Sequence, residues 1–425
     1  MVKRTVEELR QEAADLFHVA IDAADPGPAT ARALLNRSEV IEAAKSVTLL
    51  AFGKGAVAMA RAALPIVGEK LRYGVVVTTE MAAEPVENLE VIAGGHPVPN
   101  EGSLVGGEAL ARAATQAGGG DLVLALISGG GSALAVAPID GLDLSDKIAL
   151  NRALLRSGAD IIEMNALRSA ASRLKGGGLA YLAAPASVLG LILSDVPGDD
   201  PAVVASGPTA PGAANPSALT KAIERVGAAG FSPEKLKPIA ATRAEPPTPG
   251  DVINRIVGSN SISLDAVAAF AEKMGWKTVI LDRWLEGDVA DAAERFHAAA
   301  QDCVRSDAPV AILAGGETSV TVTGEGRGGR NQELALRLAR ICHERPFKRD
   351  WCFLSGGTDG RDGPTDAAGG LVDAGSWQRI IDAGVMPDAL LANNDSNKAL
   401  AASGDLLTTG PTGTNVADIQ ILLLR

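Results

Sequence analysis

The sequence predicts an α/β protein of two domains, each built as three layers (α/β/α) with a sheet between helices. Its 425 residues are too many for one ordinary hydrophobic core. Apolar runs typical of buried strands alternate with amphipathic helical stretches, which is the pattern of α/β folds. Six of these runs end in small or polar loops, marked by Lys54, Ser128, Asp195, Gly316, Asp359 and Asn394. Ligands bind outside the carboxyl ends of such strands, so we expect the active site in a cleft between the domains.

The composition limits the classes of partner. A net charge of −12 argues against broad nucleic-acid binding, and an acidic protein that binds an anion must concentrate its Lys and Arg residues locally. No apolar run approaches the length of a membrane span, and the first residues lack the apolar core of a signal peptide. Three widely spaced cysteines without a metal-binding spacing indicate reduced thiols. We therefore expect a cytoplasmic protein with small-molecule substrates and no membrane or nucleic-acid partner.

The first candidate loop follows a helical region over residues 5–45. Residues 46–52 have the pattern of a strand, and Gly53-Lys54-Gly55 separates them from a helical stretch that begins at Ala56. This order places the positive charge of Lys54 beside a helix N-terminus. A surface lysine in a flexible turn is the alternative, and the GxxxxGK[ST] spacing of a Walker A loop is missing.

The second candidate loop, residues 128–132, follows another apolar run. Its glycines, Gly129–Gly131, leave the backbone open to a ligand, and the hydroxyls of Ser128 and Ser132 flank them. Successive backbone N–H groups in such a turn can hold a phosphate or carboxylate, whereas a tight turn that needs positive φ angles is the alternative. His96, in a Gly- and Pro-rich loop, is a further candidate for substrate binding, with ordinary turn chemistry as its alternative.

Two more segments of this half carry charges in informative places. Residues 144–175 have the pattern of one long helix, in which Arg168 and Lys175 are seven positions apart and share a face. That face is either solvent-exposed or near a bound anion. The apolar run 187–193 leads to three carboxylates, of which Asp195 is the first. Such a cluster favours Mg²⁺ binding or general-base catalysis, while a capping role is the alternative for the other two.

A stretch rich in Pro, Ala and Thr over residues 211–250 marks the expected border and gives domains 1–240 and 250–425. In the second domain, a buried strand leads to Glu317, and the alternation over residues 319–323 predicts an antiparallel strand. The second sheet is therefore expected to be mixed.

The most polar loops of the second domain surround a helix predicted to begin near Arg330. Residues 324–329 match the spacing GxGxxG, but the preceding strand alternates and two arginines crowd the turn, so the motif is weak. A helix that opens with Arg330 and Asn331 can instead present a guanidinium fork to phosphate. Asp359 lies in the densest polar loop of the chain and is a second metal-ligand candidate.

Taken together, these motifs resemble the class II (MOFRL-type) glycerate 2-kinases. The resemblance implies an N-terminal Rossmann-like domain, a C-terminal MOFRL-type domain, and phosphorylation of D-glycerate by ATP, with Mg²⁺, to 2-phosphoglycerate. The resemblance also implies catalysis by Lys54, Asp195 and Arg330, and it is compatible with a homodimer. Some members of the family are labelled as hydroxypyruvate reductases. The matching runs cover nearly the whole chain in order and are residues 53–56, 94–97, 128–132, 165–177, 194–199, 329–333, 355–360 and 411–415.

Phosphoryl transfer needs positioning groups, cations that offset the charge of the phosphoryl oxygens, and a base near the attacking hydroxyl. We expect Lys54 and Arg330 to hold the transferring phosphoryl group and the substrate carboxylate. Asp195 is expected to orient or deprotonate the 2-hydroxyl or to bind Mg²⁺, and the sequence leaves this choice open; Asp359 is the second metal candidate. The predicted substrate- and phosphate-binding residues are Gly53, Gly55, His96, Ser128, Gly129, Gly130, Gly131, Ser132, Arg168, Lys175, Glu317 and Asn331.

Two other functions stay open at this point. An NAD(P)-dependent hydroxypyruvate reductase has residues 324–329 as its only internal support. A non-catalytic protein that binds a small carboxylate is disfavoured by the number of positioned Asp, Lys and Arg residues.

Overall fold

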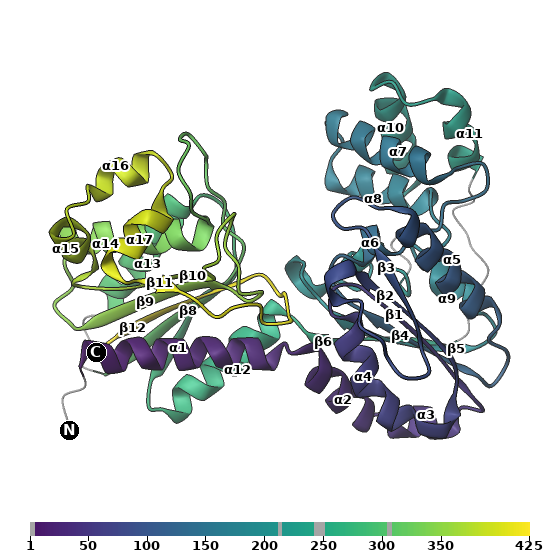
Figure 1. Cartoon of the computed structure of the whole chain (residues 1–425), viewed down its shortest axis with the longest axis horizontal. Helices are drawn as coiled ribbons and strands as arrows, with labels where there is room; N and C mark the ends of the chain where they lie inside the picture. The colour runs from purple at the N-terminus through teal and green to yellow at the C-terminus, as the bar shows by residue number, and fades with distance from the viewer. Residues whose placement is uncertain (1–4, 211–214, 242–250, 304–307) are drawn as a thin grey trace. The chain divides into compact units, whose positions relative to one another are not determined.

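The computed structural model describes residues 5–210, 215–241, 251–303 and 308–425, which form two compact units (Figure 1). The N-terminal unit is Pro26–Val257, and the C-terminal unit combines the chain up to Asp25 with Gly258–Arg425. The expected domains, 1–240 and 250–425, differ from these units at both borders, and residues 211–214 and 242–250 of the expected border stretch lie outside those described. The first helix joins the C-terminal unit, and the strand that begins at Val252 completes the N-terminal sheet.

A six-stranded sheet with the order β3-β2-β1-β4-β5-β6 forms the centre of the N-terminal unit. The first five strands of this order run parallel to their neighbours, which confirms the expected Rossmann-like sheet. The strands are β1 (Val47–Phe52), β2 (Leu71–Thr79), β3 (Glu90–Gly94), β4 (Leu122–Ile127), β5 (Ser187–Leu193) and β6 (Val252–Gly258). The chain moves outward from β1 to β3 and then in the opposite direction from β4, so the order reverses between β1 and β4.

Helices cover both faces of this sheet, because alternate residues of its buried strands enter different cores. Leu50 of β1 lies in one core and Leu49 in the other. The helices on the Leu49 face are α2 (Pro26–Leu35), α3 (Ser38–Ala43) and α4 (Ala56–Val67). Those on the Leu50 face are α5 (Glu101–Thr115), α6 (Gly131–Leu134) and α9 (Gly178–Ala183).

Four more helices of this unit form a group with its own core around Leu150, Leu167 and Val226 (Figure 1). They are α7 (Leu144–Arg156), α8 (Ile161–Ala170), α10 (Pro216–Ala228) and α11 (Pro233–Ala241), and we call them the helical group.

The long helix expected over residues 144–175 is divided. Gly158 adopts a positive φ after α7, and the side chain of Asp160 caps α8 by accepting a hydrogen bond from the Glu163 amide at 2.8 Å. Helix α8 then ends at Ala170, so Lys175 lies in the following turn. The sequence pattern had predicted that Arg168 and Lys175 share a helical face. This prediction is wrong, because Lys175 lies outside the helix that carries Arg168.

The C-terminal unit contains a second six-stranded sheet with the order β11-β10-β9-β12-β8-β7. Only β7 and β8 are parallel neighbours, and the other pairs are antiparallel, so the expected mixed sheet is confirmed. The strands are β7 (Lys277–Leu285), β8 (Val310–Gly316), β9 (Trp351–Gly357), β10 (Gly369–Asp373), β11 (Leu406–Leu407) and β12 (Asp418–Leu424). The strand expected at residues 319–323 does not form. Its only bridge joins Ser319 to Asp288, because the Thr323 amide donates to the Asn394 side chain instead of to a strand.

Helices also cover both faces of the second sheet (Figure 1). Helices α1 (Val6–Ala23) and α12 (Asn260–Lys273) lie on one face, where Leu16 and Phe17 of α1 are fully buried. Arg10 of α1 forms ion pairs with Asp373 at 2.6 Å and Asp405 at 2.9 Å, which fixes α1 to this unit. The other face carries α13 (Val289–Cys303), α14 (Arg330–Glu344), α15 (Ser376–Asp382), α16 (Pro387–Ala392) and α17 (Ser396–Ser403).

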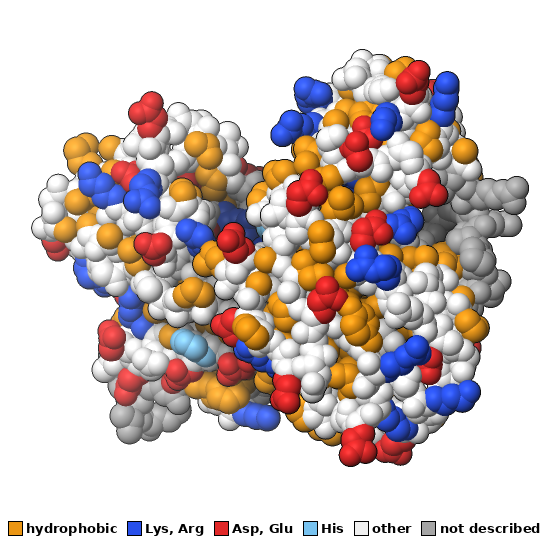
Figure 2. All heavy atoms as spheres, turned by 45° about the vertical axis from the view of Figure 1, so that its right-hand side comes forward, with side chains coloured by type: hydrophobic (Ala, Val, Ile, Leu, Met, Phe, Trp, Pro, Cys, Tyr) orange, Lys and Arg blue, Asp and Glu red, His pale blue; other side chains and the backbone are white. Residues whose placement is uncertain are grey.

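The composition predicts no membrane span, reduced cysteines and no broad positively charged surface. No helix in the described ranges is long and apolar enough to cross a membrane. The three cysteines, Cys303, Cys342 and Cys352, are free thiols. On the face shown in Figure 2, Lys and Arg side chains are interspersed with Asp and Glu, without a broad area of one sign.

Candidate active site

Two Gly-rich loops of the N-terminal unit meet where the strand order reverses. Gly53-Lys54-Gly55 follows β1 and Ser128–Gly131 follows β4, which is the neighbour of β1. The Lys54 amide donates to the Gly129 carbonyl at 2.9 Å, and the Gly55 amide donates to the Ser128 hydroxyl at 3.0 Å. Gly53 has a φ of +123°, and a Cβ there would lie 2.2 Å from Ser128 Oγ, so only glycine fits. The two loops are thus joined into one structure at the edge where α/β sheets bind ligands.

Charged side chains from other strand ends approach this pair of loops. A Cβ on Gly129 would lie 2.3 Å from Oδ2 of Asp195, which follows β5. A Cβ on Gly130 would lie 3.1 Å from the ring of His96 and 3.4 Å from Cγ of Lys54. The structure therefore brings Lys54, His96 and Asp195 together around the glycines, as the sequence predicted. Partial burial and the positive charge of Lys54 lower the pKa of His96, which favours its neutral form near pH 7.

Within the described residues, the amides of Gly129 and Gly130 donate no hydrogen bond to the protein. Gly130 adopts the left-handed conformation, with a φ of +81°, which turns successive amides toward one side of the loop. Unused amides beside the cation of Lys54 are a suitable place for an anion.

Lys175 enters the site from the turn that follows α8. Its Nζ donates to the hydroxyl of Ser132 at 2.5 Å, and that hydroxyl lies 3.4 Å from the hydroxyl of Ser206. Burial strongly lowers the pKa of Lys175, and the positive charges of Lys147 and Arg168 lower it further. The structure therefore places the predicted Arg168 and Lys175 near each other through tertiary packing.

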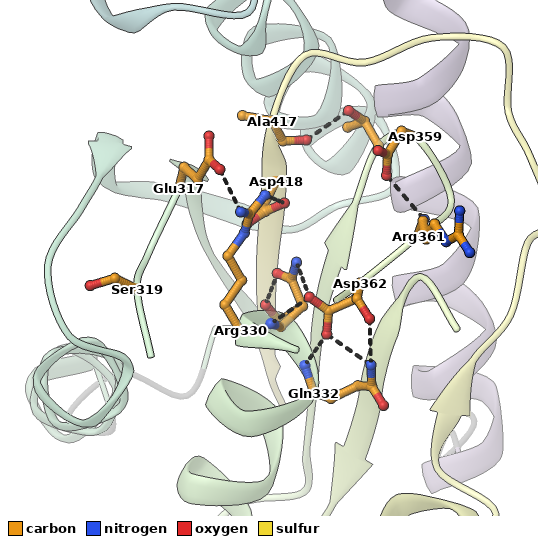
Figure 3. Close-up of polar contacts among 12 residues, drawn as sticks. Glu317, Ser319, Arg330, Gln332, Asp359, Arg361, Asp362, Ala417 and Asp418 are labelled. Atoms are coloured by element: carbon orange, nitrogen blue, oxygen red, sulfur yellow. Dashed lines mark hydrogen bonds and ion pairs between the residues drawn. The ribbon is translucent and has the colours of Figure 1, made fainter. Parts of the chain in front are cut away.

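In the C-terminal unit, Arg330 opens α14 and is held by two carboxylates (Figure 3). Its Nε and Nη2 donate to Asp418 at 2.6 and 3.0 Å, and its Nη1 donates to Glu317. Burial raises the pKa of Asp418 to about 6, although the Arg330 guanidinium opposes the shift. Burial also acts to lower the pKa of Arg330, but the hydrogen bonds and charge of Asp418 outweigh it and raise that pKa, so Arg330 stays charged.

The N-terminus of α14 is capped by a buried aspartate of the β9–β10 connection. The carboxylate of Asp362 accepts hydrogen bonds from the amides of Asn331 at 3.2 Å and Gln332 at 2.9 Å (Figure 3). Asn331 is fully buried, and its side-chain oxygen accepts from the Ser355 hydroxyl at 2.6 Å. Asn331 was predicted to bind substrate, and in this structure both polar atoms of its side chain are bonded within the protein.

The weak GxGxxG segment is packed against the loop after α16. The amides of Gly324 and Glu325 donate to the side chains of Asn394 and Asn393, each at 3.1 Å, and the Arg327 amide donates to Asp395 at 3.1 Å. A dinucleotide site needs such amides and the following helix N-terminus for pyrophosphate. Here both are occupied by side chains of the protein.

The two metal candidates, Asp195 and Asp359, belong to different units. Asp359 is half-buried, and its Oδ1 accepts a hydrogen bond from the Arg361 amide at 3.0 Å (Figure 3). Among the described residues, no group of three or more His, Cys, Asp and Glu side chains is arranged to hold a metal ion. Mg²⁺ commonly uses one or two carboxylates together with substrate phosphates, so these aspartates suit that ion only in the presence of a phosphate ligand.

Sequence reasoning missed three residues of these sites: Lys147, Asp362 and Asp418. Lys147 had a weak signal, because it occupies the core-facing position of the series Leu144, Lys147 and Leu150 on α7. Asp418 begins β12, which is apolar except for Gln420, and had the pattern of an ordinary strand end. Asp362 lies in the polar loop that contains Asp359, and nothing in its spacing pointed to α14.

Comparison with known proteins places this geometry in a family. The family model described as a domain of unknown function (DUF4147) matches residues 12–239, and the MOFRL family model matches residues 310–418. A D-glycerate 2-kinase of Thermotoga maritima is 38% identical over 98% of this chain and 99% of its own length. The chain belongs to the class II (MOFRL-type) glycerate 2-kinase family. The resemblance recognised in the sequence is thereby confirmed.

The solved structures and a differently named relative agree with this family over the full length. A crystal structure of a glycerate kinase from Thermotoga maritima has a TM-score of 0.90 and 37% identity, covering 99% of this chain and 100% of that one. A relative from Agrobacterium vitis, 40% identical over 98% of this chain and 94% of its own, bears the name "Putative hydroxypyruvate reductase". Relatives at similar distance thus carry two names, and the site must decide between the two chemistries.

Proposed function

We propose that this protein is a glycerate 2-kinase, which transfers the γ-phosphoryl group of ATP to the 2-hydroxyl of D-glycerate. The observation that carries the proposal is that Lys54 and Asp195 lie beside Gly129 and Gly130, whose amides donate no hydrogen bond within the described residues. This arrangement supplies a cation, a carboxylate and an anion-binding backbone at one sheet edge. These are the components that phosphoryl transfer requires, since its catalysis is mostly positioning and electrostatic stabilisation.

Each of the three predicted catalytic residues has a role in this proposal. Lys54 is exposed and its ammonium offsets negative charge on the transferring phosphoryl group. Asp195 accepts the proton of the attacking hydroxyl or orients that hydroxyl toward the phosphorus. Arg330, kept charged and oriented by Asp418, binds a phosphate or the glycerate carboxylate with its remaining N–H groups.

Asp195 in the N-terminal unit and Asp359 in the C-terminal unit are the two residues that would each offer Mg²⁺ a carboxylate oxygen, the type of ligand that this ion prefers. When bound, the ion neutralises charge on the phosphate oxygens of ATP. The residues of the chain hold the substrates: the amides of Gly129 and Gly130 donate to an anionic oxygen, and Ser128 keeps the two loops together through the Gly55 amide.

The reductase is the weaker alternative. Its sole support in the sequence is the segment 324–329, and the amides of residues 324–327 in it are bonded to Asn393, Asn394 and Asp395. The N-terminus of α14 is occupied by Asp362. A pyrophosphate group at this motif would have to displace these bonds. A protein that only binds a small carboxylate has no need for the carboxylate of Asp195 beside an anion site, where it repels such a ligand.

A coupled assay of ADP release with D-glycerate, L-glycerate and hydroxypyruvate tests the proposal, together with nicotinamide absorbance in parallel reactions. We expect ADP release with D-glycerate and no hydride transfer with hydroxypyruvate. Asp195→Asn is expected to lower kcat by about 10²–10⁴-fold, the usual contribution of general acid–base catalysis, with an unchanged melting temperature. NADH oxidation by hydroxypyruvate without ADP release from any of the three compounds would replace the kinase by the reductase.

A further inference from the structure

A cluster of three cations lies between the helical group and the loop after β4. Lys147 comes from α7, Arg168 from α8, and Lys175 from the turn that follows α8. Lys147 and Lys175 are only 9% and 8% exposed, and Arg168 is half-buried. The three side chains lie close enough for their charges to act on one another, and Lys175 Nζ contacts the Ser132 hydroxyl that directly follows the Gly-rich loop.

No carboxylate balances these charges. Across the described ranges of the chain, none of the three cations makes an ion pair, and their hydrogen bonds are made to the neutral groups Ser132 and Asn151. Lys235, in the same helical group, shows the contrast, because it pairs with Asp146 at 2.6 Å while being more exposed. Burying charges without a partner is costly, and proteins keep such an arrangement where a ligand supplies the opposite charge.

The number of charges indicates the kind of ligand. A monocarboxylate such as glycerate carries one negative charge, which leaves most of the cluster unbalanced. A phosphate group carries about two negative charges, and a triphosphate chain carries more. Lys side chains and a planar Arg fork are the groups that proteins use to bind phosphate. Ser132 and Ser206 add hydroxyl donors beside Lys175.

We propose that Lys147, Arg168 and Lys175 form a phosphate-binding subsite, which takes the phosphate chain of the nucleotide or the phosphate of the phosphorylated product. The assignment of these phosphates to substrate and product rests on the proposed kinase function. The binding of phosphate itself does not. Lys147 is the decisive member, because it is buried and its ammonium has no hydrogen-bond or ion-pair partner in the described chain.

Calorimetric melting in phosphate-free buffer, with and without sodium tripolyphosphate, tests the subsite. We expect tripolyphosphate to raise the melting temperature of the wild type by mass action. Lys147→Met should need about tenfold or more tripolyphosphate for the same rise, because one charge-assisted contact is lost. Without ligand it should melt at or above the wild-type temperature, since an unbalanced buried charge is removed. Lys221→Met, which removes an exposed lysine of α10 in the same helical group, is the matched control and should behave like the wild type.

An unchanged tripolyphosphate requirement in Lys147→Met would overturn the subsite. A lower ligand-free melting temperature together with an unchanged requirement would give Lys147 a purely structural role. Arg168→Gln is the second variant, because Arg168 is only half-buried and its replacement leaves the core intact. It is judged by the same tripolyphosphate criterion if Lys147→Met does not fold.

Steady-state kinetics separate the two phosphate sources. A raised KM for ATP in Lys147→Met, with the KM for glycerate unchanged, assigns the subsite to the nucleotide. A raised inhibition constant of 2-phosphoglycerate assigns it to the product. An increase confined to the KM for glycerate would overturn the phosphate assignment in favour of a carboxylate. If the wild type releases no ADP, the proposed function fails, while the tripolyphosphate comparison still decides the subsite.

Discussion

The two units of this protein handle buried positive charge in opposite ways. In the C-terminal unit, Arg330 is enclosed by Asp418 and Glu317, which orient it through ion pairs. In the N-terminal unit, Lys147, Arg168 and Lys175 have no acidic partner within the described residues. A cation balanced by the protein is held ready in one geometry. A cation left unbalanced stores unfavourable energy that an anionic ligand relieves on binding.

The pKa shifts follow the same division. Asp418 holds the pKa of Arg330 above its ordinary value, whereas burial and the charge of Arg168 lower the pKa of Lys147 to about 8. The comparison therefore predicts that removing charge destabilises the first site and stabilises the second.

The largest expected effect is that of Arg330→Ala. It leaves the Asp418 carboxylate, 1% exposed, without its guanidinium, which costs about 3–5 kcal/mol of unfolding free energy, and it lowers kcat by orders of magnitude. All four tryptophans, Trp276, Trp284, Trp351 and Trp377, lie in the C-terminal unit, so tryptophan fluorescence during urea unfolding reports on that unit. Arg330→Lys, which keeps the charge, is the control and should recover part of the stability. Equal urea midpoints for Arg330→Ala and wild type would show that the ion pair does not hold this region.

Lys54→Ala should affect catalysis alone. Lys54 is exposed, so its removal leaves the core intact, but the transferring phosphoryl group loses a cation and kcat should fall by about 10²–10³-fold. The measurement is the initial rate of ADP release with saturating substrates, beside a melting curve. The exposed lysine variant Lys221→Met should keep the wild-type rate. A Lys54→Ala enzyme with a normal kcat would remove Lys54 from the mechanism.

The stability of the N-terminal unit should depend on pH through Lys147. Its folded pKa of about 8 lies below the usual 10.5, so between these values the unfolded chain binds more protons than the folded one. The unfolding free energy therefore rises with pH across this window, by at most about 3 kcal/mol, as the buried ammonium loses its proton. Calorimetry of ligand-free protein should show Lys147→Met more stable than wild type near neutral pH, and the difference should shrink toward about pH 10. A difference that stays constant with pH would contradict the unbalanced charge.

Asp418→Asn should change the pH profile of kcat/KM. With its pKa raised to about 6 by burial, Asp418 takes up a proton below that pH and loses its attraction for Arg330. The wild type should therefore lose activity as the pH falls through about 6. The amide variant should show about tenfold lower kcat/KM at neutral pH, where a charge-assisted bond has been replaced by a neutral one, and a flatter acid side. An unaltered acid limb in Asp418→Asn would assign that limb to another group.

The smallest expected effect concerns NADH. The amides of residues 324–327 and the N-terminus of α14 are bonded within the C-terminal unit, so NADH should leave the calorimetric melting temperature of the wild type unchanged. A saturable rise in melting temperature would mean that the motif opens to a dinucleotide.

The fold and the N-terminal loops could be predicted from local sequence patterns. Gly-rich turns after apolar runs placed Lys54, Ser128 and Asp195 at the carboxyl ends of parallel strands, and parallel strands carry those ends to the same edge of the sheet. That topological rule needs no knowledge of tertiary contacts. It is the reason that distant loops of the N-terminal unit were assigned to one site.

The remainder depends on packing that no local pattern encodes. Helix α1 has a generic apolar face, and its polar contacts with distant residues, such as the Arg10 pairs with Asp373 and Asp405, specify which sheet it covers. Lys147 lies in the cation cluster because α7 and α8 pack into one core. Asn331 was expected to be accessible at the start of a helix, but it is hydrogen-bonded to Ser355 and Asp362 inside the protein. The sequence shows that each of these residues is polar, but the residues that they contact are distant in the sequence.

Phosphorus NMR of a reaction of the wild type with D-glycerate and ATP tests the central claim most directly. The account predicts that 2-phosphoglycerate and ADP appear in equal amounts, and that both signals are lost together in Lys54→Ala. Inorganic phosphate in place of phosphoglycerate, or a phosphate on the 3-hydroxyl, would contradict it.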